Sequence, residues 1–211
     1  MKGCQNMAHR CDSRLPITPD ILRRILQALN HTVNNFYLRI LLKTIFLTAF
    51  NAFLRLGEIT VRDPHHTHLV LQRSDVTLNS ADVPGAQIIL RHFKHKKDQN
   101  PVVIFVKALP SSPYCPVKHL SQYLNAFQHV SGPLFQFLDG KPVTCSFVSE
   151  HLQHAIRFIG LNPRLYKGHS FRIGAATHAS NLGYSENAIQ NMGRWHSNAV
   201  RRYIRLQAFE I

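Results

Sequence analysis

One long apolar stretch, residues 34–54, limits the folds that this chain can adopt. Its apolar side chains recur too continuously for a helix with one solvent-facing side, and such a pattern is typical of a helix that is buried on most of its surface. The most apolar part, residues 44–54, is much shorter than a bilayer span and is followed by Arg55. We therefore predict a central helix around which the chain packs, and no insertion into a membrane.

Further helices are predicted on both sides of this central helix. Thr18, Pro19 and Asp20 supply an N-cap, a proline in the first turn and an early acidic residue, and apolar residues follow at helical spacing until about Asn30. Residues 113–117 form a predicted loop that leads into another apolar-periodic segment. The later part of the chain predicts helices over residues 146–159, 170–182, 185–192 and 197–208, with Gly183 placed to end the second of these.

The middle of the chain has the β-branched content of short strands. Three such runs lie around residues 70–78, 87–90 and 102–106, with turn residues between them. They predict a small three-stranded antiparallel sheet. The predicted fold class is therefore α+β and mostly helical, with a flexible leader over residues 1–17 and one domain over residues 18–211.

The charge of the chain indicates a polyanionic partner. Lysine and arginine total 25 against 11 acidic residues, which gives a formal net charge of +14. Such a surplus is more than solubility requires and favours nucleic acid over an anionic membrane. His65, His66 and His68 lack acidic or thiol partners at ligand spacing, so we expect no metal site there. We expect no other cofactor.

A stretch near the C-terminus holds residue types that suit phosphate chemistry. His169 and Arg172 are three residues apart and would project from one face of a helix. An arginine can donate two parallel hydrogen bonds to a phosphate, and an imidazole can transfer a proton near neutral pH. Tyr203 follows Arg172 by 31 residues, and its phenol can attack phosphorus if its proton is removed and the developing charge is stabilised.

These residues resemble the signature of the tyrosine recombinases, or phage integrases. That family has a His-x-x-Arg motif, then a Gly-His or Gly-Trp turn, then a nucleophilic tyrosine. The corresponding places are held here by His169, Arg172, Trp195 and Tyr203. Arg194 intervenes between Gly193 and Trp195, so His196 is an alternative to Trp195. The surrounding sequence resembles recombinases of the DIRS, Ngaro and Crypton mobile elements.

The resemblance also covers the end of the predicted central helix and the predicted sheet. Arg55 and Glu58 match the family's first box, although Phe53 stands where the family usually has glycine or alanine. The basic turn before the third strand matches the hairpin that carries the family's catalytic lysine. Lys94 is the preferred candidate, because seven residues separate it from the strand that begins at residue 102, and Lys96 is the alternative.

The resemblance implies a reaction and a role for each residue. Tyr203 would attack the scissile phosphate of double-stranded DNA, giving a 3′-phosphotyrosyl bond and a free 5′-hydroxyl. Arg55 and Arg172 would hold the phosphate oxygens, and Glu58 would support Arg55. Lys94 would protonate the leaving oxygen, His169 would act as the base and Trp195 would position the phosphate. Other phosphates of the DNA would be held by Lys96, Lys97, Arg194, Arg201 and Arg202.

For the whole protein the resemblance implies integration or recombination of a mobile element, a homo-oligomer on DNA, and location in the nucleus. Family members generally have a separate N-terminal core-binding domain that closes around DNA, and residues 1–17 are too short to form one. A non-catalytic DNA-binding protein derived from such a recombinase is therefore the alternative. A basic helical module with accidental resemblance is the third interpretation, and it predicts that the arginines do not converge.

Overall fold

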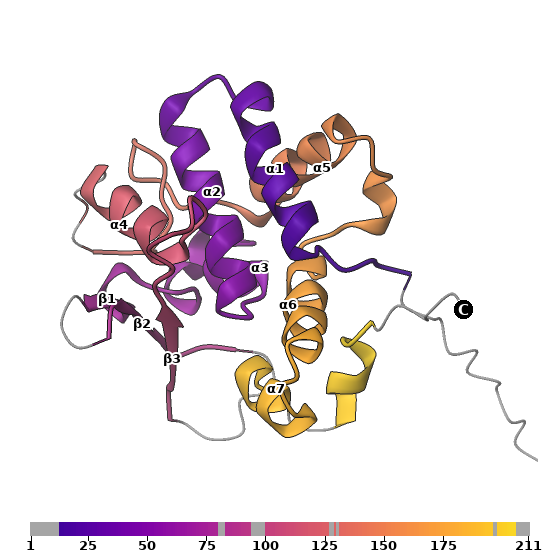
Figure 1. Ribbon diagram of the computed structural model, residues 1–211. Coiled ribbons are helices and arrows are strands. Elements are labelled where there is room, and N and C mark those ends of the chain that lie inside the picture. The colour runs from indigo at the N-terminus through magenta and orange to yellow at the C-terminus, as the bar shows by residue number, and fades with distance from the viewer. Residues whose placement is uncertain are drawn as a thin grey trace, which may run out of the picture.

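The predicted central helix is α2 (Phe36–Asn51) in the computed structural model, which describes residues 13–79, 83–93, 100–126, 129, 131–195 and 198–205. Its second half is buried from Leu41 to Phe50 except at Lys43. Three helices pack against it, namely α1 (Pro19–Thr32), α4 (Pro116–Ala126) and α6 (Ser170–Asn181). A further helix, α5 (Cys145–Phe158), packs against α1 (Figure 1). The central position predicted for this helix is confirmed.

Local signals at the helix ends explain where α1 and α2 begin and stop. The hydroxyl of Thr18 accepts from the backbone N–H of Ile21 at 3.3 Å, which is the N-cap predicted from the sequence. At its C-terminal end, α2 stops at Asn51, which is earlier than predicted. The cause is Phe53, which adopts a left-handed conformation with φ of 51°. This residue turns the chain into the short helix α3 (Leu56–Ile59).

The three predicted strands form one antiparallel sheet in the order β1-β2-β3. They are β1 (Val76–Asn79), β2 (Gly85–Leu90) and β3 (Val102–Lys107). Val70, which was predicted in the first strand, lies instead between the 3-10 helices η1 (Pro64–Leu69) and η2 (Arg73–Asp75). On β2, Ala86, Ile88 and Leu90 are buried and join the core. The sheet lies beside α4 and is well separated from α5 (Figure 1).

The C-terminal part contains α6, α7 (Glu186–Gly193) and the 3-10 helix η4 (Asn198–Arg202). Gly183 follows α6 with φ of 83°, as its predicted stop position requires. The helix predicted over residues 197–208 is wrong over its described part, because only the short η4 forms. Thr177 on α6 explains the difference. Its hydroxyl donates to the carbonyl of Tyr203 at 3.2 Å and accepts from the N–H of Arg205 at 3.0 Å, so the chain turns toward α6.

The end of the predicted leader belongs to the packed structure. The N–H of Leu15 donates to the carbonyl of Leu165 in η3 (Pro163–Leu165), and the N–H of Ile17 donates to Ser170. Ile17 is completely buried. The folded unit therefore begins before residue 18, which corrects the predicted boundary. Residues 1–12 lie outside the described part.

The apolar interior has two parts. The main core is built mostly from α1, α2, α4, α5 and the buried face of the sheet. A smaller group, called here the C-terminal cluster, consists of Ala176, Ala179, Ile189, Trp195 and Val200. Phe53 and Tyr203 are partly buried against this cluster. None of the described helices has the length and apolarity that a membrane span needs.

Candidate active site

Three segments that are distant in the sequence meet beside the C-terminal cluster. They are the turn between α2 and α3, the first turn of α6, and the described residues 193–195 and 198–203. Arg172 is at the centre, with its guanidinium carbon 4.6 Å from the ring centre of Trp195 and 5.8 Å from that of Tyr203. The ring of Tyr203 in turn lies 4.9 Å from the ring of His169 and 4.6 Å from that of Trp195. Four of the predicted catalytic side chains therefore form one cluster, in which Tyr203 contacts the other three.

Arg55 is held at the start of α3 by Glu58. One carboxylate oxygen of Glu58 accepts from the backbone N–H of Arg55 at 2.8 Å, and the other accepts from its guanidinium at 2.7 Å. The Arg55 side chain remains 21% exposed, whereas that of Glu58 is 5% exposed. Burial, and after it the positive charge of Arg55, lowers the pKa of Arg172 to about 9. Arg55 therefore belongs to the same electrostatic site as Arg172.

Two glycines permit the close approaches that build the site. A Cβ atom on Gly168 would lie 2.5 Å from a methyl carbon of Leu56, so a larger residue just before α6 would require the Leu56 side chain of α3 to shift. A Cβ on Gly193 would lie 1.7 Å from the ring of Trp195, which folds back over this glycine. The glycine of the predicted turn thus places the indole on Arg172.

Arg172 has no exposed surface. Its two terminal nitrogens donate to the backbone carbonyls of Phe53 and Gly193, the latter at 2.6 Å. Its Nε and the indole nitrogen of Trp195 are buried without a hydrogen-bond partner, as is Nε of Arg194. Among the described residues these are three of five such atoms, and all three are N–H donors. Because unpaired buried donors are costly, the site favours a ligand with acceptor oxygens.

Arg194 does not lie where the sequence predicted it. It was predicted to contact DNA, but its side chain is 4% exposed and lies beneath the site. Its guanidinium donates to the carbonyls of Ala52 and Phe53 and to the carboxylate of Glu58. The expectation of a surface contact is corrected, because the backbone of Arg194 is left-handed (φ 56°) and directs the side chain inward to these acceptors.

The other predicted residues fall into two groups. Arg201 and Arg202 are exposed, as a contact with DNA requires, although Arg201 also pairs with Glu186 at 2.9 Å. Their binding to DNA stays a prediction. Four residues lie outside the described part of the chain, namely Lys94, Lys96, Lys97 and His196.

The charges of the site suit an anion. Three guanidinium groups, from Arg55, Arg172 and Arg194, surround the single carboxylate of Glu58. This leaves a surplus of two positive charges in a partly buried place, which a phosphate group can offset. Within the described part of the chain, no group of three or more histidine, cysteine, aspartate or glutamate side chains is placed to hold a metal ion.

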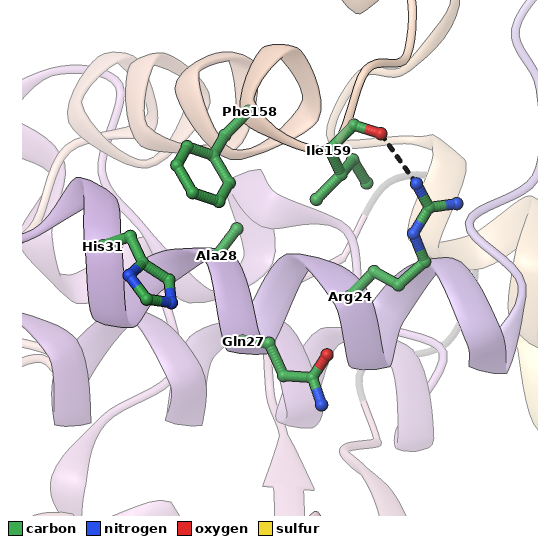
Figure 2. Close-up of a pocket in the computed structure, with 6 residues that line it drawn as sticks. All are labelled: Arg24, Gln27, Ala28, His31, Phe158 and Ile159. Carbon is green, nitrogen blue, oxygen red and sulfur yellow. Dashed lines mark hydrogen bonds between the residues drawn. The ribbon is translucent and has the colours of Figure 1, made fainter.

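A shallow groove elsewhere on the molecule is unrelated to these side chains. It lies between α1 and α5 and is lined by Arg24, Gln27, Ala28, His31, Phe158 and Ile159 (Figure 2). Arg24 donates to the carbonyl of Ile159 at 2.7 Å, and the ring of His31 stacks on Phe158 at 5.4 Å. The arginine thus satisfies a carbonyl at the end of α5, and the groove is a seam between two packed helices.

Comparisons with known proteins bear on the fold. No family model and no curated protein sequence matches the chain. Solved structures do match. The XerH site-specific recombinase in a post-cleavage complex with a palindromic difH substrate has a TM-score of 0.70 and 16% identity, over 97% of this chain and 52% of that chain. This chain has the fold of a tyrosine recombinase catalytic domain.

Two further structures agree with this result. XerA recombinase has a TM-score of 0.67 and 17% identity, over 92% of this chain and 61% of that chain. A lambda integrase dimer bound to a COC′ core site has a TM-score of 0.62 and 16% identity, over 94% of this chain and 62% of that chain. The chain therefore spans between about half and two thirds of the length of the structures it matches.

The sequence did not reveal how the site is supported from below. Phe53 and Arg194 are the two places where the chain departs from the family pattern, and they are in contact. Arg194 donates to the carbonyl of Phe53 at 2.9 Å, and the ring of Phe53 meets that of Trp195 edge-on at 6.4 Å. The joint departure of Phe53 and Arg194 from the motif was the only sign in the sequence of a contact between these two residues. The hydroxyl of Thr177 gave no comparable signal.

Proposed function

We propose that this chain cleaves and rejoins DNA strands by transesterification, with Tyr203 as the nucleophile. The observation that carries the proposal is the contact of the Tyr203 ring with three groups that such chemistry uses. These are an imidazole, a guanidinium and an indole, from His169, Arg172 and Trp195. A phenol beside a base and a cation can lose its proton as it attacks phosphorus.

The proposed step conserves bond energy. The phenol oxygen of Tyr203 forms a bond to phosphorus, and the bond from phosphorus to the 5′-oxygen breaks. His169 takes the phenol proton, and the 5′-oxygen receives a proton from a lysine in the sequence between β2 and β3, for which Lys94 is the preferred candidate. The transition state carries two negative charges on its non-bridging oxygens. The surplus of two positive charges at Arg55, Arg172 and Arg194 is suited to it.

DNA must displace one contact before this step. The ring of Tyr203 lies over the guanidinium of Arg172, where a phosphate would bind. A rotation of the Tyr203 side chain would open this face and present the phenol oxygen to the phosphate. The unpaired Nε of Arg172 and the indole N–H of Trp195 are the donors that a phosphate oxygen would then meet.

The wider biological role is also part of the proposal. We propose DNA integration or recombination of a mobile element, in the nucleus, by copies of this chain assembled on double-stranded DNA. The net charge of +14 supports binding to DNA. The matched XerH structure is bound to a palindromic difH substrate, and the matched lambda integrase is a dimer bound to a COC′ core site. The mobile element and the nucleus rest on the resemblance of the sequence around His169 and Trp195.

A non-catalytic DNA-binding protein is the alternative function. One observation favours it. Arg172 is completely buried, and both of its terminal nitrogens are already bonded to backbone carbonyls, at Phe53 and Gly193. If this arrangement persists on DNA, the guanidinium supports the fold and cannot hold a phosphate with both arms.

A covalent-trapping assay distinguishes the two functions. The chain is incubated with supercoiled and nicked DNA and denatured, and protein attached to DNA is measured. We expect an adduct that is lost in Tyr203→Phe and retained in Tyr184→Phe, a matched change at an exposed tyrosine after α6. No adduct from the unaltered chain, together with salt-sensitive DNA binding, would support the non-catalytic alternative.

A further inference from the structure

Arg194 fastens the end of α7 to the turn between α2 and α3. It is the residue that follows α7, and its guanidinium reaches across to Ala52, Phe53 and Glu58. The distances run from 2.9 Å for Phe53 to 3.3 Å for Ala52. The residue is 8% exposed. A buried arginine that spans two segments of the site fixes their separation.

Two acceptors of Arg194 are shared with the other two arginines of the site, and its third acceptor in the turn, the carbonyl of Ala52, is adjacent to Phe53. The carbonyl of Phe53 accepts from both Arg194 and Arg172. The carboxylate of Glu58 accepts from both Arg194 and Arg55. Arg194 is thus linked through one shared acceptor to each of the two other guanidinium groups of the site.

We infer that Arg194 is a positioning residue that sets the orientation of Arg55 and Arg172 toward the scissile phosphate. The inference rests on the proposed function and adds a residue to it. Arg194 acts through the carbonyl of Phe53 and the carboxylate of Glu58, and it makes no contact with DNA. Displacement of these two acceptors would move both arginines away from the phosphate.

The backbone at this contact agrees with such a role. Phe53 and Arg194 are the only non-glycine residues with positive φ in the part of the chain that the structure describes. A left-handed backbone at a bulky residue is costly and persists only where the surroundings hold it. Here the bonds from Arg194 to the carbonyls of Ala52 and Phe53 hold the turn.

The planar fork of arginine is needed for this arrangement. One terminal nitrogen donates to Ala52 and Met192, and the other donates to Phe53 and Glu58. A lysine carries the same charge on a single nitrogen and cannot span acceptors that lie to both sides. Arg194→Lys therefore separates the geometry of the fork from the charge.

The test uses three variants of the full chain. Arg194→Met removes the fork and the charge but keeps an unbranched side chain, and Arg194→Lys keeps the charge. Leu152→Ala, a fully buried change in α5 of the main core, controls for lost stability. For each variant we would measure the affinity for duplex DNA and, separately, the rate of adduct formation at saturating DNA.

Arg194→Met is expected to lower the rate of adduct formation by about 10²-fold, the effect of a small displacement of catalytic groups, with DNA affinity close to that of the unaltered chain. Arg194→Lys should recover part of the rate, and Leu152→Ala should leave the rate of the folded protein unchanged. An Arg194→Met rate equal to that of Leu152→Ala, or a loss of DNA affinity in step with the rate, would overturn the inference. If Arg194→Met does not fold, Arg194→Lys decides by the same criteria.

A second measurement separates this inference from the proposed function. Orthovanadate mimics the five-coordinate transition state of phosphoryl transfer, and its binding can be followed without DNA by the fluorescence of Trp195, the single tryptophan of the chain. Weaker binding by Arg194→Met than by Leu152→Ala supports the inference even if the unaltered chain forms no adduct, a result that contradicts only the proposed function. Equal orthovanadate binding by the unaltered chain, Arg194→Met and Leu152→Ala overturns the inference about Arg194.

Discussion

The main core and the C-terminal cluster differ in the kind of side chain that they bury. The main core buries aliphatic and aromatic side chains, mostly from four helices and the sheet, and such burial of apolar surface is the usual source of stability. The C-terminal cluster buries few apolar residues and lies against two buried arginines, Arg172 and Arg194. It also contacts the two left-handed residues of the described chain that are not glycine.

This difference separates the part of the molecule that stabilises the fold from the part proposed to carry the reaction. Buried charges cost desolvation energy that their partners only partly offset, and left-handed bulky residues add strain. Such costs persist in proteins where a function depends on them. The main core therefore stabilises the fold, and its stability offsets the cost of burying the cationic groups beside the C-terminal cluster.

The largest expected effect is on stability, from a cavity in the main core. Leu29 lies on α1 and is completely buried. Leu29→Ala should lower the free energy of unfolding by about 2–5 kcal/mol, measured by urea denaturation, while the folded fraction keeps its rate of adduct formation. A rate that falls in the folded fraction would contradict the separation of the two parts.

The converse change is Arg55→Gln in the site. Because the Arg55 side chain is partly exposed and Glu58 keeps its bond to Arg194, the free energy of unfolding should change by about 1 kcal/mol or less. The rate of adduct formation should fall by about 10²–10³-fold, the effect of removing one charge-stabilising donor. A large loss of stability with an unchanged rate would assign Arg55 to the fold alone.

A smaller effect is expected at Thr177, which joins α6 to the segment of Tyr203. Thr177→Val keeps the shape of the side chain and removes the hydroxyl that bonds to Tyr203 and Arg205. We expect a loss of about 1 kcal/mol in unfolding free energy and a reduced rate of adduct formation. Thr32→Val is a matched control, because the hydroxyl of Thr32 bonds only to Ala28 within α1. The idea fails if both variants have the same rate.

The smallest expected effect is on the pH dependence of stability. Burial lowers the pKa of four histidines, namely His119, His129, His151 and His178. Because the unfolded chain binds protons at these residues at a higher pH than the folded chain does, stability is fully present above the unfolded pKa of about 6.5 and is lost as the pH falls below it.

Urea denaturation between about pH 7 and pH 5 checks this direction. His178→Phe should reduce the dependence on pH, because the ring of His178 packs beside Phe50 and an apolar ring at the same place takes up no proton. Stability that rises as the pH falls, in the unaltered chain, would contradict the assigned sign.

The fold was predictable from the sequence where periodicity and caps agree. The apolar run of α2 and the N-cap at Thr18 specified two helices, and β-branched runs specified the sheet. The end of α2 was not predictable, because the left-handed conformation of Phe53 depends on bonds from Arg172 and Arg194, which come from distant parts of the chain. The short η4 in place of a long helix has the same cause, through Thr177.

The residue types of the candidate site were predictable from the sequence, but the burial of its arginines was not. His169, Arg172, Trp195 and Tyr203 come together as the motif spacing indicated. The complete burial of Arg172 and the inward turn of Arg194 were not predictable, because local sequence does not specify which acceptors a long side chain will reach across a fold.

The most direct test of a tyrosine-based active site is to identify the residue that becomes joined to DNA. After trapping, protein and DNA are digested, and the peptide that carries a nucleotide is sequenced by tandem mass spectrometry. We expect the nucleotide on Tyr203, linked through its 3′-phosphate. A nucleotide on another of the six tyrosines, or a linkage through a 5′-phosphate, would contradict Tyr203 as the nucleophile.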